Sequence, residues 1–319
     1  MKRILVIQPL RPEAVALLDA RTDVTYSIVT DFSEANLLAH VADVDGITIR
    51  DAPLPASVIA AAPKLKVVSR HGVGYDNIPV ATCTARGIPV TVVGAVNTIS
   101  VAEQTMLLML AAARAAVELD ASVRRGDFAV RSRVTGLQLS GRTVLVVGLG
   151  RIGREVARRC LAFGMRVLAF DPYLAGPAEP GVEVVPSLRD ALPLAHVVTL
   201  HVPYTDENRH LIGAVELALL PPKAVLVNAS RGGLVDEGAL VAAVRSGHLF
   251  GAGLDTFERE PLPGDSPLLT EPRIVLSPHT AALTDEGLIG MGVMTVSNVL
   301  AGLDGNLDPE LVVNREVLG

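Results

Sequence analysis

Short apolar runs bounded by Gly, Pro or Asp alternate with Ala-, Leu- and Arg-rich stretches along the whole chain. The short runs predict strands that are buried on both faces, and the stretches between them have the composition of helices. This alternation is typical of parallel sheets built from βαβ units, so the sequence predicts the α/β fold class with two doubly wound parallel sheets. The predicted strands are residues 4–7, 24–28, 46–49, 65–69 and 89–91 in a first set, and residues 143–147, 166–170, 197–201, 224–228, 249–254 and 273–277 in a second.

A long helix is expected between the two sets of strands. Ser100 precedes Glu103 by three positions, a pattern typical of a helix N-terminus, and the helical pattern continues to about Asp120. An Arg-rich polar segment, residues 124–133, follows it. We therefore place a domain boundary at this helix. The tail from residue 284 to 319 predicts one more helix, which has too little apolar surface to stand alone.

Composition and charge narrow the class of protein. The 319 residues suffice for two domains, half of them are apolar, and Trp is absent, which predicts a core of aliphatic side chains. The net charge is −6, and the arginines are scattered instead of forming a basic run. Nucleic acid is therefore not an expected partner.

Cysteine usage and hydropathy bear on the compartment. Cys83 and Cys160 are far apart and neither belongs to a CxxC pair, so neither disulfides nor a metal site is predicted. The N-terminus lacks the pattern of a signal peptide, and the apolar stretch 101–117 is interrupted by charged and polar residues. We expect a cytoplasmic protein without a membrane span.

A glycine fingerprint marks a dinucleotide site. Gly148, Gly150 and Gly153 follow the strand 143–147 and precede a predicted helix, residues 154–163. These glycines permit a tight turn, close approach of a pyrophosphate and close packing of helix on strand. Asp171 ends the next strand, where a carboxylate accepts hydrogen bonds from ribose hydroxyls, so NAD is predicted over NADP. A Gly-rich turn with an incidental Asp is the competing interpretation, and it leaves the order of strand, turn, helix and strand unexplained.

Three polar residues follow predicted strands of the second set. Arg231, Glu260 and His279 each come shortly after a strand ends, and open α/β sheets bind ligands at that edge. Other interpretations remain: His279 as a surface or capping residue, and Arg231 with Glu260 as a structural ion pair. Glu258 and Arg259 are close enough to Glu260 to be mistaken for it.

At these motifs the chain resembles the D-isomer-specific 2-hydroxyacid dehydrogenase family, with most similarity to its D-3-phosphoglycerate dehydrogenase branch. The resemblance covers nearly the whole chain. The segments that carry it are residues 70–77, residues 97–103, the glycine fingerprint with Asp171, His201-Val202-Pro203, and the segments around Arg231, Glu260 and His279.

The resemblance implies a Rossmann NAD-binding domain, residues 99–283, inserted into a flavodoxin-like substrate domain, residues 1–98 and 284–319, with the active site in a cleft between them. It gives catalytic roles to Arg231, Glu260 and His279. The implied cofactor-binding residues are Gly148, Gly150, Arg151, Ile152, Gly153, Asp171, His201, Val202, Pro203, Ala229, Ser230 and Asp255. The implied substrate-binding residues are Arg70, His71, Gly72, Val73, Gly74 and Asn97.

The chemistry of hydride transfer explains these residue types. Oxidation of a secondary alcohol requires a base for the hydroxyl proton, and the ordinary pKa of His279 suits that task. The Glu260 carboxylate would fix the imidazole tautomer and raise its pKa. Arg231 offers a planar fork to a substrate carboxylate, and the amides of residues 72–74 would form a nest for the same group. Asp255 would meet the nicotinamide amide.

Several points stay open at this stage. A phosphate held by Arg70 with the arginines near Arg131 and Arg133 would favour 3-phosphoglycerate, and glyoxylate or hydroxypyruvate reduction is the alternative. An NAD-sensing scaffold of the corepressor type is a further hypothesis. A formate-dehydrogenase-like function is disfavoured, because that branch of the family has Gln at the position of Glu260. His71 and Phe128 depart from the residues common in relatives. A homodimer through the long helix is expected, and serine feedback is not, because no regulatory domain follows residue 319.

Overall fold

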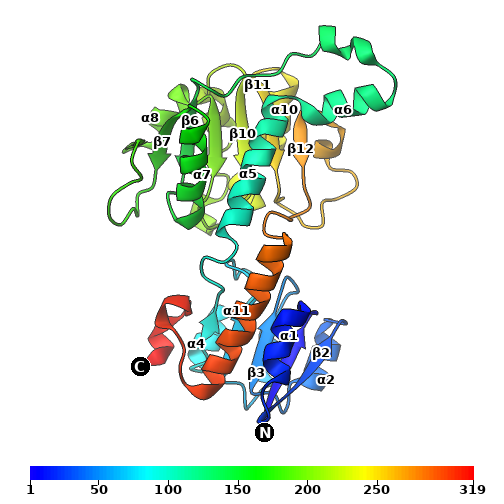
Figure 1. The fold of residues 1–319 in the computed structure, drawn as a ribbon, viewed down its shortest axis with the longest axis vertical. Coiled ribbons are helices and arrows are strands. Elements are labelled where there is room, and N and C mark those ends of the chain that lie inside the picture. The colour runs from blue at the N-terminus through cyan, green and yellow to red at the C-terminus, as the bar shows by residue number, and fades with distance from the viewer. The chain divides into compact units, whose positions relative to one another are not determined.

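The computed structural model describes residues 1–319 and divides into two compact units. Unit 1 consists of Met1–Asn97 and Leu283–Gly319, and unit 2 is Thr98–Ala282 (Figure 1). Unit 1 carries a five-stranded sheet and unit 2 a seven-stranded sheet, and all neighbouring strands pair in parallel. The predicted fold class, α/β with two parallel sheets, is confirmed.

The sheet of unit 1 has the strand order β2-β1-β3-β4-β5, which is the flavodoxin-like order. Its strands are β1 (Lys2–Ile7), β2 (Val24–Val29), β3 (Gly46–Ile49), β4 (Val67–Arg70) and β5 (Val90–Thr91). Its helices are α1 (Pro12–Asp19), α2 (Glu34–His40), α3 (Ala56–Ala60), α4 (Val80–Ala85) and α11 (Asp285–Asp304), and the tail adds the short helices η6 (Pro309–Leu311) and η7 (Arg315–Leu318).

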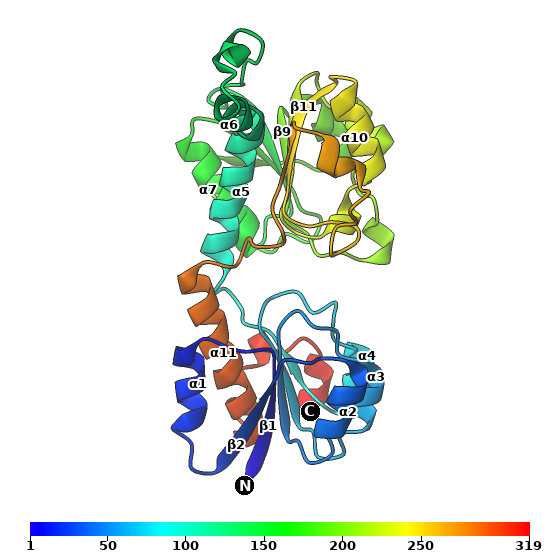
Figure 2. The same ribbon diagram turned by 90° about the vertical axis from the view of Figure 1, so that its right-hand side faces the viewer.

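Helices cover both faces of this sheet, α1 and α11 on one and α2, α3 and α4 on the other (Figure 2). Alternate residues of β1 therefore enter different cores. Ile4 and Val6 pack with α1 and α11, whereas Leu5 and Ile7 pack in the cluster that contains α2 and α3. This two-sided burial explains why the strand is apolar at consecutive positions instead of alternate ones.

Helix α11 is long and apolar enough to cross a membrane by length and composition alone. That criterion is weak for a single helix, because core helices of globular domains also meet it. Within unit 1, α11 packs on α1, β3 and β4, with Val296 and Val299 fully buried. Packing on the sheet accounts for its apolar face.

The sheet of unit 2 has the order β12-β11-β10-β9-β6-β7-β8. Its chain order reverses between β6 and β9, and ligands of such sheets bind at this switch point, beyond the carboxyl ends of the strands. The strands are β6 (Thr143–Val147), β7 (Arg166–Phe170), β8 (Val182–Val184), β9 (Val197–Leu200), β10 (Ala224–Asn228), β11 (Leu249–Leu254) and β12 (Ile274–Leu276).

Helices α5 and α7 cover one face of the unit 2 sheet and α10 covers the other (Figure 2). The α-helices are α5 (Thr98–Ala113), α6 (Ala116–Arg124), α7 (Arg151–Ala162), α8 (Leu188–Ala191), α9 (Ala214–Leu219) and α10 (Glu237–Arg245). The short 3-10 helices are η1 (Phe128–Ser132), η2 (Leu192–Leu194), η3 (Asp206–Asn208), η4 (Gly232–Leu234) and η5 (Pro267–Thr270).

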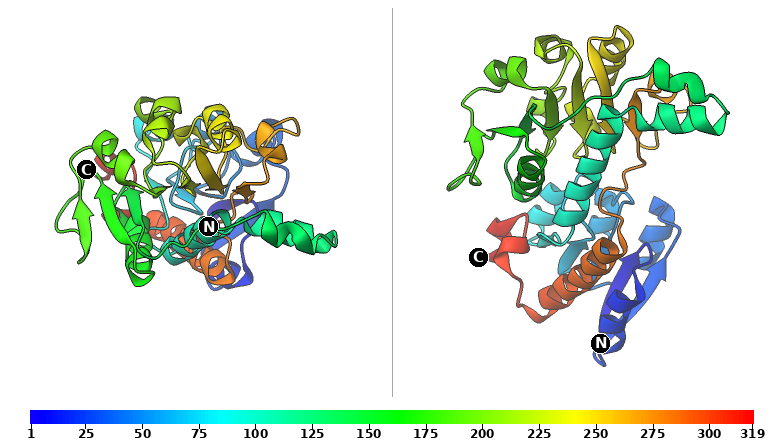
Figure 3. Two further views of the ribbon diagram at one scale, coloured as in Figure 1. Left: turned by 90° about the horizontal axis from the view of Figure 1, so that it is seen from above. Right: turned by 45° about the horizontal axis from the view of Figure 1, so that its top comes forward.

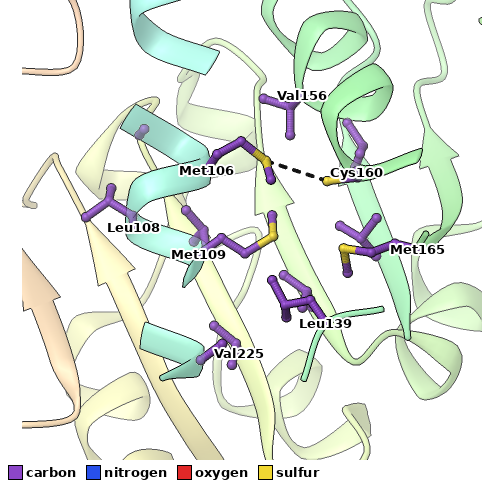
Figure 4. Packing of buried hydrophobic residues seen from close by; sticks show 14 of the residues in the cluster. Met106, Leu108, Met109, Leu139, Val156, Cys160, Met165 and Val225 are labelled. Carbon is purple, nitrogen blue, oxygen red and sulfur yellow. Dashed lines mark hydrogen bonds between the residues drawn. The ribbon is translucent and has the colours of Figure 1, made fainter. Parts of the chain in front are cut away.

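Sulfur atoms meet in the core between α5 and α7 (Figure 4). The Sγ atom of Cys160 lies 3.9 Å from the Sδ atom of Met106. Burial raises the pKa of the Cys160 thiol to about 12 and that of Cys83 to about 11. Both cysteines are free and buried, so they are packing residues with little thiolate at neutral pH.

The long helix predicted from about residue 97 to Asp120 is wrong in two respects. Helix α5 starts at Thr98, so the Ser100–Glu103 pattern lies inside its first turns and does not mark its start. The helix ends at Ala113, because Ala115 adopts a left-handed conformation with φ of 49°, and α6 begins after it. The segment from α6 to η1 extends away from the sheet of unit 2 (Figure 3). Strand β8 was not predicted, and α7 begins three residues earlier than predicted, at Arg151.

Candidate active site

The glycine turn joins β6 to α7 in unit 2. Gly148 has a φ of 91°, and a Cβ atom there would lie 2.5 Å from the backbone oxygen of His201. A Cβ on Gly153 would lie 2.0 Å from the Gly148 oxygen, whereas a Cβ on Gly150 would meet open space. Two glycines are therefore required by the fold of the turn. Gly150 leaves open space beside the start of α7.

Asp171 follows β7 and connects to this turn. One carboxylate oxygen, Oδ2, accepts a hydrogen bond of 2.9 Å from the Leu149 N–H, and the other accepts one of 2.9 Å from the Tyr173 N–H. The carboxylate is thereby fixed beside the glycine turn at the edge of the sheet where the resemblance places a ribose. Each carboxylate oxygen can accept more than one hydrogen bond, so both retain capacity for hydroxyl donors.

The surroundings of the turn fit a dinucleotide. No side chain caps the N-terminus of α7 at Gly150, so its first N–H groups are available to an anion. His201 donates or accepts at Nε2 with the Thr199 hydroxyl, 2.9 Å away, while its Nδ1 is buried without a partner. Burial lowers the pKa of His201 to about 3, so the ring is neutral. Val202 also contacts the turn, with a side-chain carbon 2.8 Å from the Cβ position of Gly148.

The loop after β10 carries Arg231 and is shaped by Asn228. The fully buried Asn228 side chain accepts from the Ser230 N–H at 3.0 Å and donates to the Arg231 backbone oxygen at 2.8 Å. The Ser230 hydroxyl donates to the backbone oxygen of Leu200 at 2.6 Å, and Ala229 is 9% exposed. Local hydrogen bonds therefore fix the start of the Arg231 side chain, and sequence analysis did not identify Asn228 as their source.

Asp255, after β11, is fully buried, and its carboxylate holds the loop that carries His279. Its Oδ1 accepts from the Thr280 N–H at 3.0 Å and from the Ser277 hydroxyl, and its Oδ2 accepts from the Ala281 N–H at 2.8 Å. Its backbone oxygen accepts from the His279 N–H at 2.7 Å. The nicotinamide contact stays a prediction for Asp255, whereas its role in the fold of this loop is visible.

Glu260 and His279 form a hydrogen-bonded pair. Glu260 Oε2 lies 2.8 Å from His279 Nδ1, and Oε1 accepts from the Phe257 N–H at 3.0 Å. A carboxylate only accepts hydrogen bonds, so Nδ1 carries hydrogen and Nε2 is the nitrogen that exchanges a proton with a ligand. His279 has a φ of 52°, a conformation that costs energy for a residue other than Gly and that is often found at functional sites.

The electrostatics of the pair match its geometry. The hydrogen bond to Glu260 raises the pKa of His279 above its ordinary value, although burial and the positive charge of Arg231 oppose this rise. Burial raises the pKa of Glu260, but the bonds from His279 and Phe257 and the charge of Arg231 lower it overall. Arg231 thus acts on both groups. The structure brings Arg231, Glu260 and His279 together within unit 2, as the sequence predicts, and Glu258 and Arg259 do not bond to His279.

The predicted substrate-binding residues lie in unit 1. The Arg70 guanidinium bonds to Asn77 and Asp51, at 3.2 Å each, and to the backbone oxygen of His71, and it packs against Gly72. Its side chain is 12% exposed, so Arg70 supports the loop 70–77 from within. Val73 at its tip is 37% exposed.

His71 and Asn97 are almost completely buried in unit 1. Burial and the charges of Arg50 and Arg70 lower the pKa of His71 to about 4. Arg50 follows β3, and its Nε atom is buried without a hydrogen-bond partner, as is the Oδ1 atom of Asn97. No motif in the sequence marks Arg50, although it follows a strand that pairs with the one ending in Arg70.

Arg131 and Arg133 are engaged within their own segment of unit 2. The Arg131 guanidinium lies 5.1 Å from the centre of the Phe128 ring, and Arg133 pairs with Asp127. Their part in binding a phosphate stays a prediction.

Comparison with known proteins decides the family. Residues 106–281 match the family described as "D-isomer specific 2-hydroxyacid dehydrogenase, NAD binding domain". The match includes the glycine turn, Asp171, and the three loops that carry Arg231, Glu260 and His279. The chain belongs to the D-isomer specific 2-hydroxyacid dehydrogenase family. The predicted resemblance is confirmed, and NAD is the cofactor that this family's domain binds.

Relatives with different names match nearly the whole chain. The chain is 41% identical over 317 residues to a D-3-phosphoglycerate dehydrogenase of Methanocaldococcus jannaschii, covering 98% of this chain and 60% of that protein. It is 39% identical to a glyoxylate reductase of Aeropyrum pernix, over 99% of this chain and 97% of that protein. A glyoxylate reductase structure from Paecilomyes thermophila superposes with a TM-score of 0.89 at 31% identity, covering 99% of each chain. The chain thus spans about three fifths of the phosphoglycerate dehydrogenase that it matches.

Proposed function

We propose that the chain is an NAD-dependent oxidoreductase that interconverts a small D-2-hydroxy acid and its 2-keto acid. The main support for this proposal is the hydrogen-bonded Glu260–His279 pair, which the positive charge of Arg231 influences. The pair lies in the same unit as the glycine turn. An acid–base imidazole, a fixed carboxylate and a guanidinium are the groups that such a reaction needs from a protein. The remaining chemistry belongs to NAD, which accepts a hydride from the hydroxy acid or donates one to the keto acid when bound.

His279 handles the proton in this proposal. In the direction of reduction, its Nε2 donates a proton to the oxygen that becomes the hydroxyl, and in oxidation the same atom removes it. Glu260 holds Nδ1–H and so keeps the imidazole in the tautomer that places the exchangeable proton on Nε2. It also stabilises the charged imidazolium that is required before reduction.

Arg231 binds the substrate carboxylate through its planar fork and polarises the neighbouring carbonyl. We propose unit 1 as the substrate-binding domain, with Arg70, His71, Asn97 and the backbone amides of Gly72, Val73 and Gly74 as its substrate-binding groups. Support for this assignment comes from the exposed tip of the loop 70–77. The buried Asn97 Oδ1 has no partner and, as an acceptor, suits a hydroxyl of the substrate and not its carboxylate.

The cofactor assignments follow from the contacts of the glycine turn. We propose that Gly148, Gly150 and Gly153, with the N–H groups of Arg151 and Ile152, hold the pyrophosphate. Asp171 binds the ribose hydroxyls and repels a 2′-phosphate, which favours NAD over NADP. The remaining proposed contacts to the cofactor are His201, Val202, Pro203, Ala229, Ser230 and Asp255.

The names of the relatives suggest two kinds of substrate, the phosphorylated acid 3-phosphoglycerate and the unphosphorylated acids glyoxylate and hydroxypyruvate. The Arg50 and Arg70 guanidinium groups lie close enough to His71 to lower its pKa, and Asp51, which pairs with Arg70, offsets part of their positive charge. A substrate with a phosphate in addition to its carboxylate gains from that charge, which favours 3-phosphoglycerate. Glyoxylate and hydroxypyruvate are the second candidates.

A rate comparison tests the proposal. Purified protein is mixed with NADH and, separately, with glyoxylate, hydroxypyruvate and 3-phosphohydroxypyruvate, and the loss of nicotinamide absorbance is followed. We expect turnover of at least one acid, with the highest kcat/KM for the phosphorylated one. Tight NADH binding without turnover of any acid would instead support an NAD-sensing scaffold of the corepressor type.

We further propose a homodimer in the cytoplasm. The apolar side chains of Ile99 and Leu107 on α5, and of Val117 and Val123 on α6, are about half exposed, which suits a surface that a second copy covers. The cytoplasmic assignment rests on the two buried free thiols. Sedimentation of the purified protein measures its oligomeric state directly.

A further inference from the structure

Two glutamates link the loop after β10 to the loop after β11. Glu237 is the first residue of α10, and Glu258 lies two residues before Glu260. The Glu237 carboxylate accepts from the Glu258 N–H at 2.7 Å, and the Glu258 carboxylate accepts from the Glu237 N–H at 3.1 Å. Each side chain therefore bonds to the backbone of the other residue, and we call this reciprocal contact the Glu237–Glu258 clasp.

The backbones that the clasp joins are in direct contact. A Cβ atom on Gly232 would lie 1.8 Å from the Phe257 carbonyl carbon and 2.4 Å from the Glu258 nitrogen. Only a glycine permits this approach, and Gly232 directly follows Arg231 in the chain. The segment with Arg231 and the segment with Glu260 are thus held together at two points, the Gly232 contact and the clasp.

A third loop joins the clasp from the carboxyl end of β9. His210 Nε2 lies 3.2 Å from Glu258 Oε1, and Arg209 Nη2 lies 4.0 Å from Oε2. The His210 N–H donates to the backbone oxygen of Gly233 at 2.8 Å, and His210 has a left-handed φ of 52°. A non-glycine residue in this conformation costs energy, and the bond from its N–H to Gly233 holds the His210 backbone, although His210 Nε2 itself forms no hydrogen bond.

Helix formation alone does not explain Glu237. The N-terminus of α10 is already capped, because the Asp236 side chain accepts from the Ala239 N–H at 2.9 Å. Burial raises the pKa of the Glu237 carboxyl, the bond from the Glu258 N–H lowers it, and the negative charges of Glu258 and Glu260 raise it further. Two further carboxylates beside the Glu260 carboxylate are therefore electrostatically unfavourable, and capping of α10 does not account for them.

We propose that Glu237 and Glu258 are positioning residues, whose clasp fixes Glu260 against His279 and keeps Arg231 beside that pair. Neither glutamate bonds to His279, so neither is a catalytic residue. The inference rests on the proposed dehydrogenase function for its kinetic consequences, but the geometry of the Glu260–His279 pair that it explains exists whatever the substrate.

The first test is kinetic. Glu237→Ala removes one bond of the clasp, and we expect kcat for keto-acid reduction to fall about tenfold while the Kd for NADH changes less than about twofold, because misplaced catalytic groups reduce turnover more than cofactor binding. Glu237→Gln keeps an oxygen that accepts from the Glu258 N–H and is expected to restore most of kcat. Glu258→Ala should also lower kcat. The double variant should lose about as much kcat as the more affected single variant, because both bonds belong to one contact.

The matched control is Glu216→Ala. Glu216 also bonds through its carboxylate to a backbone N–H, that of Gly213 at 3.2 Å, but at the start of α9. It should leave kcat unchanged. Equal effects of Glu216→Ala and Glu237→Ala on kcat would contradict the proposal, as would a Glu237→Ala protein that fails to fold while Glu216→Ala folds, since the clasp would then serve stability alone.

The second test does not use turnover. The pKa of His279 is measured by NMR of its imidazole in the wild type, Glu237→Ala and Glu237→Gln. We expect the raised value to fall by about half a unit or more in the Ala variant, because Glu260 no longer stays within bonding distance, and to stay near wild type in the Gln variant. Other charged groups near the pair, Arg231 and Asp255, are unchanged in all three. An unchanged pKa in Glu237→Ala overturns the clasp proposal, and absence of turnover in the wild type overturns only the dehydrogenase proposal.

Discussion

Glu260 and His279 come from loops after two neighbouring strands, and their side chains meet with 2.8 Å between Oε2 and Nδ1. The two atoms lie this close because other hydrogen bonds hold the two loops together. Asp255 lies between the strand β11 and Glu260. Its carboxylate accepts bonds from residues on both sides of His279, and its backbone oxygen accepts one from the His279 N–H. The pair is therefore a consequence of how the loops pack, and its properties can be tested one bond at a time.

The pH dependence of reduction reports on this pair. Keto-acid reduction needs protonated His279, and Glu260 raises the pKa of His279, so reduction should persist above the ordinary histidine pKa of about 6.5 and decline as the pH passes the raised value. Glu260→Gln removes the carboxylate charge, and the decline should move to lower pH, measured as kcat/KM against pH. Oxidation needs neutral His279 and should show the opposite slope. A decline at the same pH in both proteins would show that Glu260 does not set this pKa.

We expect the choice between NAD and NADP to depend on Asp171. Asp171→Asn keeps an oxygen that accepts from the Leu149 N–H but removes the negative charge. We expect the ratio of kcat/KM for NADH over NADPH to fall at least about tenfold, since about 1.4 kcal/mol of charge repulsion is lost. Kinetics with both cofactors under identical conditions measure the ratio. If selectivity stays the same, another group distinguishes the 2′-phosphate.

The glycines of the turn differ in what they do, and two alanine variants separate these roles. At Gly153 a Cβ would lie 2.0 Å from the Gly148 oxygen, so Gly153→Ala should lower the free energy of unfolding by about 1–3 kcal/mol. At Gly150 the Cβ would meet open space, so Gly150→Ala should fold normally. It should nevertheless weaken NADH binding about tenfold, because the methyl group obstructs the approach of the pyrophosphate to backbone donors.

Thermal unfolding and NADH titration of both alanine variants measure these effects. The turn does not bind the dinucleotide as proposed if Gly150→Ala binds NADH as tightly as the wild type.

Asp255 should matter for stability as much as for catalysis. Asp255→Ala leaves the buried N–H groups of Thr280 and Ala281 without acceptors, and each such loss costs about 1–3 kcal/mol. Ser277→Ala removes a hydroxyl that donates to the same carboxylate and accepts from the Gln104 side chain at 2.9 Å, and it should cost about 1 kcal/mol. Urea unfolding measures both. Similar stability of the two variants would mean that the Asp255 carboxylate does not hold the loop.

The sequence predicts those parts of the fold that depend on a local sequence pattern. The apolar run of β6 and the glycines after it indicate strand, turn and helix by themselves, and the order of Arg231, Glu260 and His279 matches the family. The break at Ala115 was not predictable, because alanine normally favours a helix and its left-handed conformation depends on contacts outside the segment. The Glu237–Glu258 clasp was likewise missed, since it joins residues that only the pairing of β10 with β11 brings together.

The glycine loop 70–74 shows a different limit. The charge of Arg70 predicts a group for a ligand, and its guanidinium also bonds to Asp51 and Asn77 and supports the loop, so its contact with a substrate stays a prediction. Arg50, whose Nε atom has no hydrogen-bond partner, was not singled out. A charged residue at a strand end can face a ligand or its own loop, and only the partners of its side chain decide between these roles.

The central claim is that His279 exchanges the proton while NADH reduces a 2-keto acid, and one pair of assays tests it most directly. Wild type and His279→Ala are compared for NADH consumption with hydroxypyruvate and 3-phosphohydroxypyruvate, together with the Kd for NADH of each protein. We expect the variant to lose about 10²–10⁴-fold in kcat and to keep its NADH affinity. Equal turnover by the two proteins would contradict it.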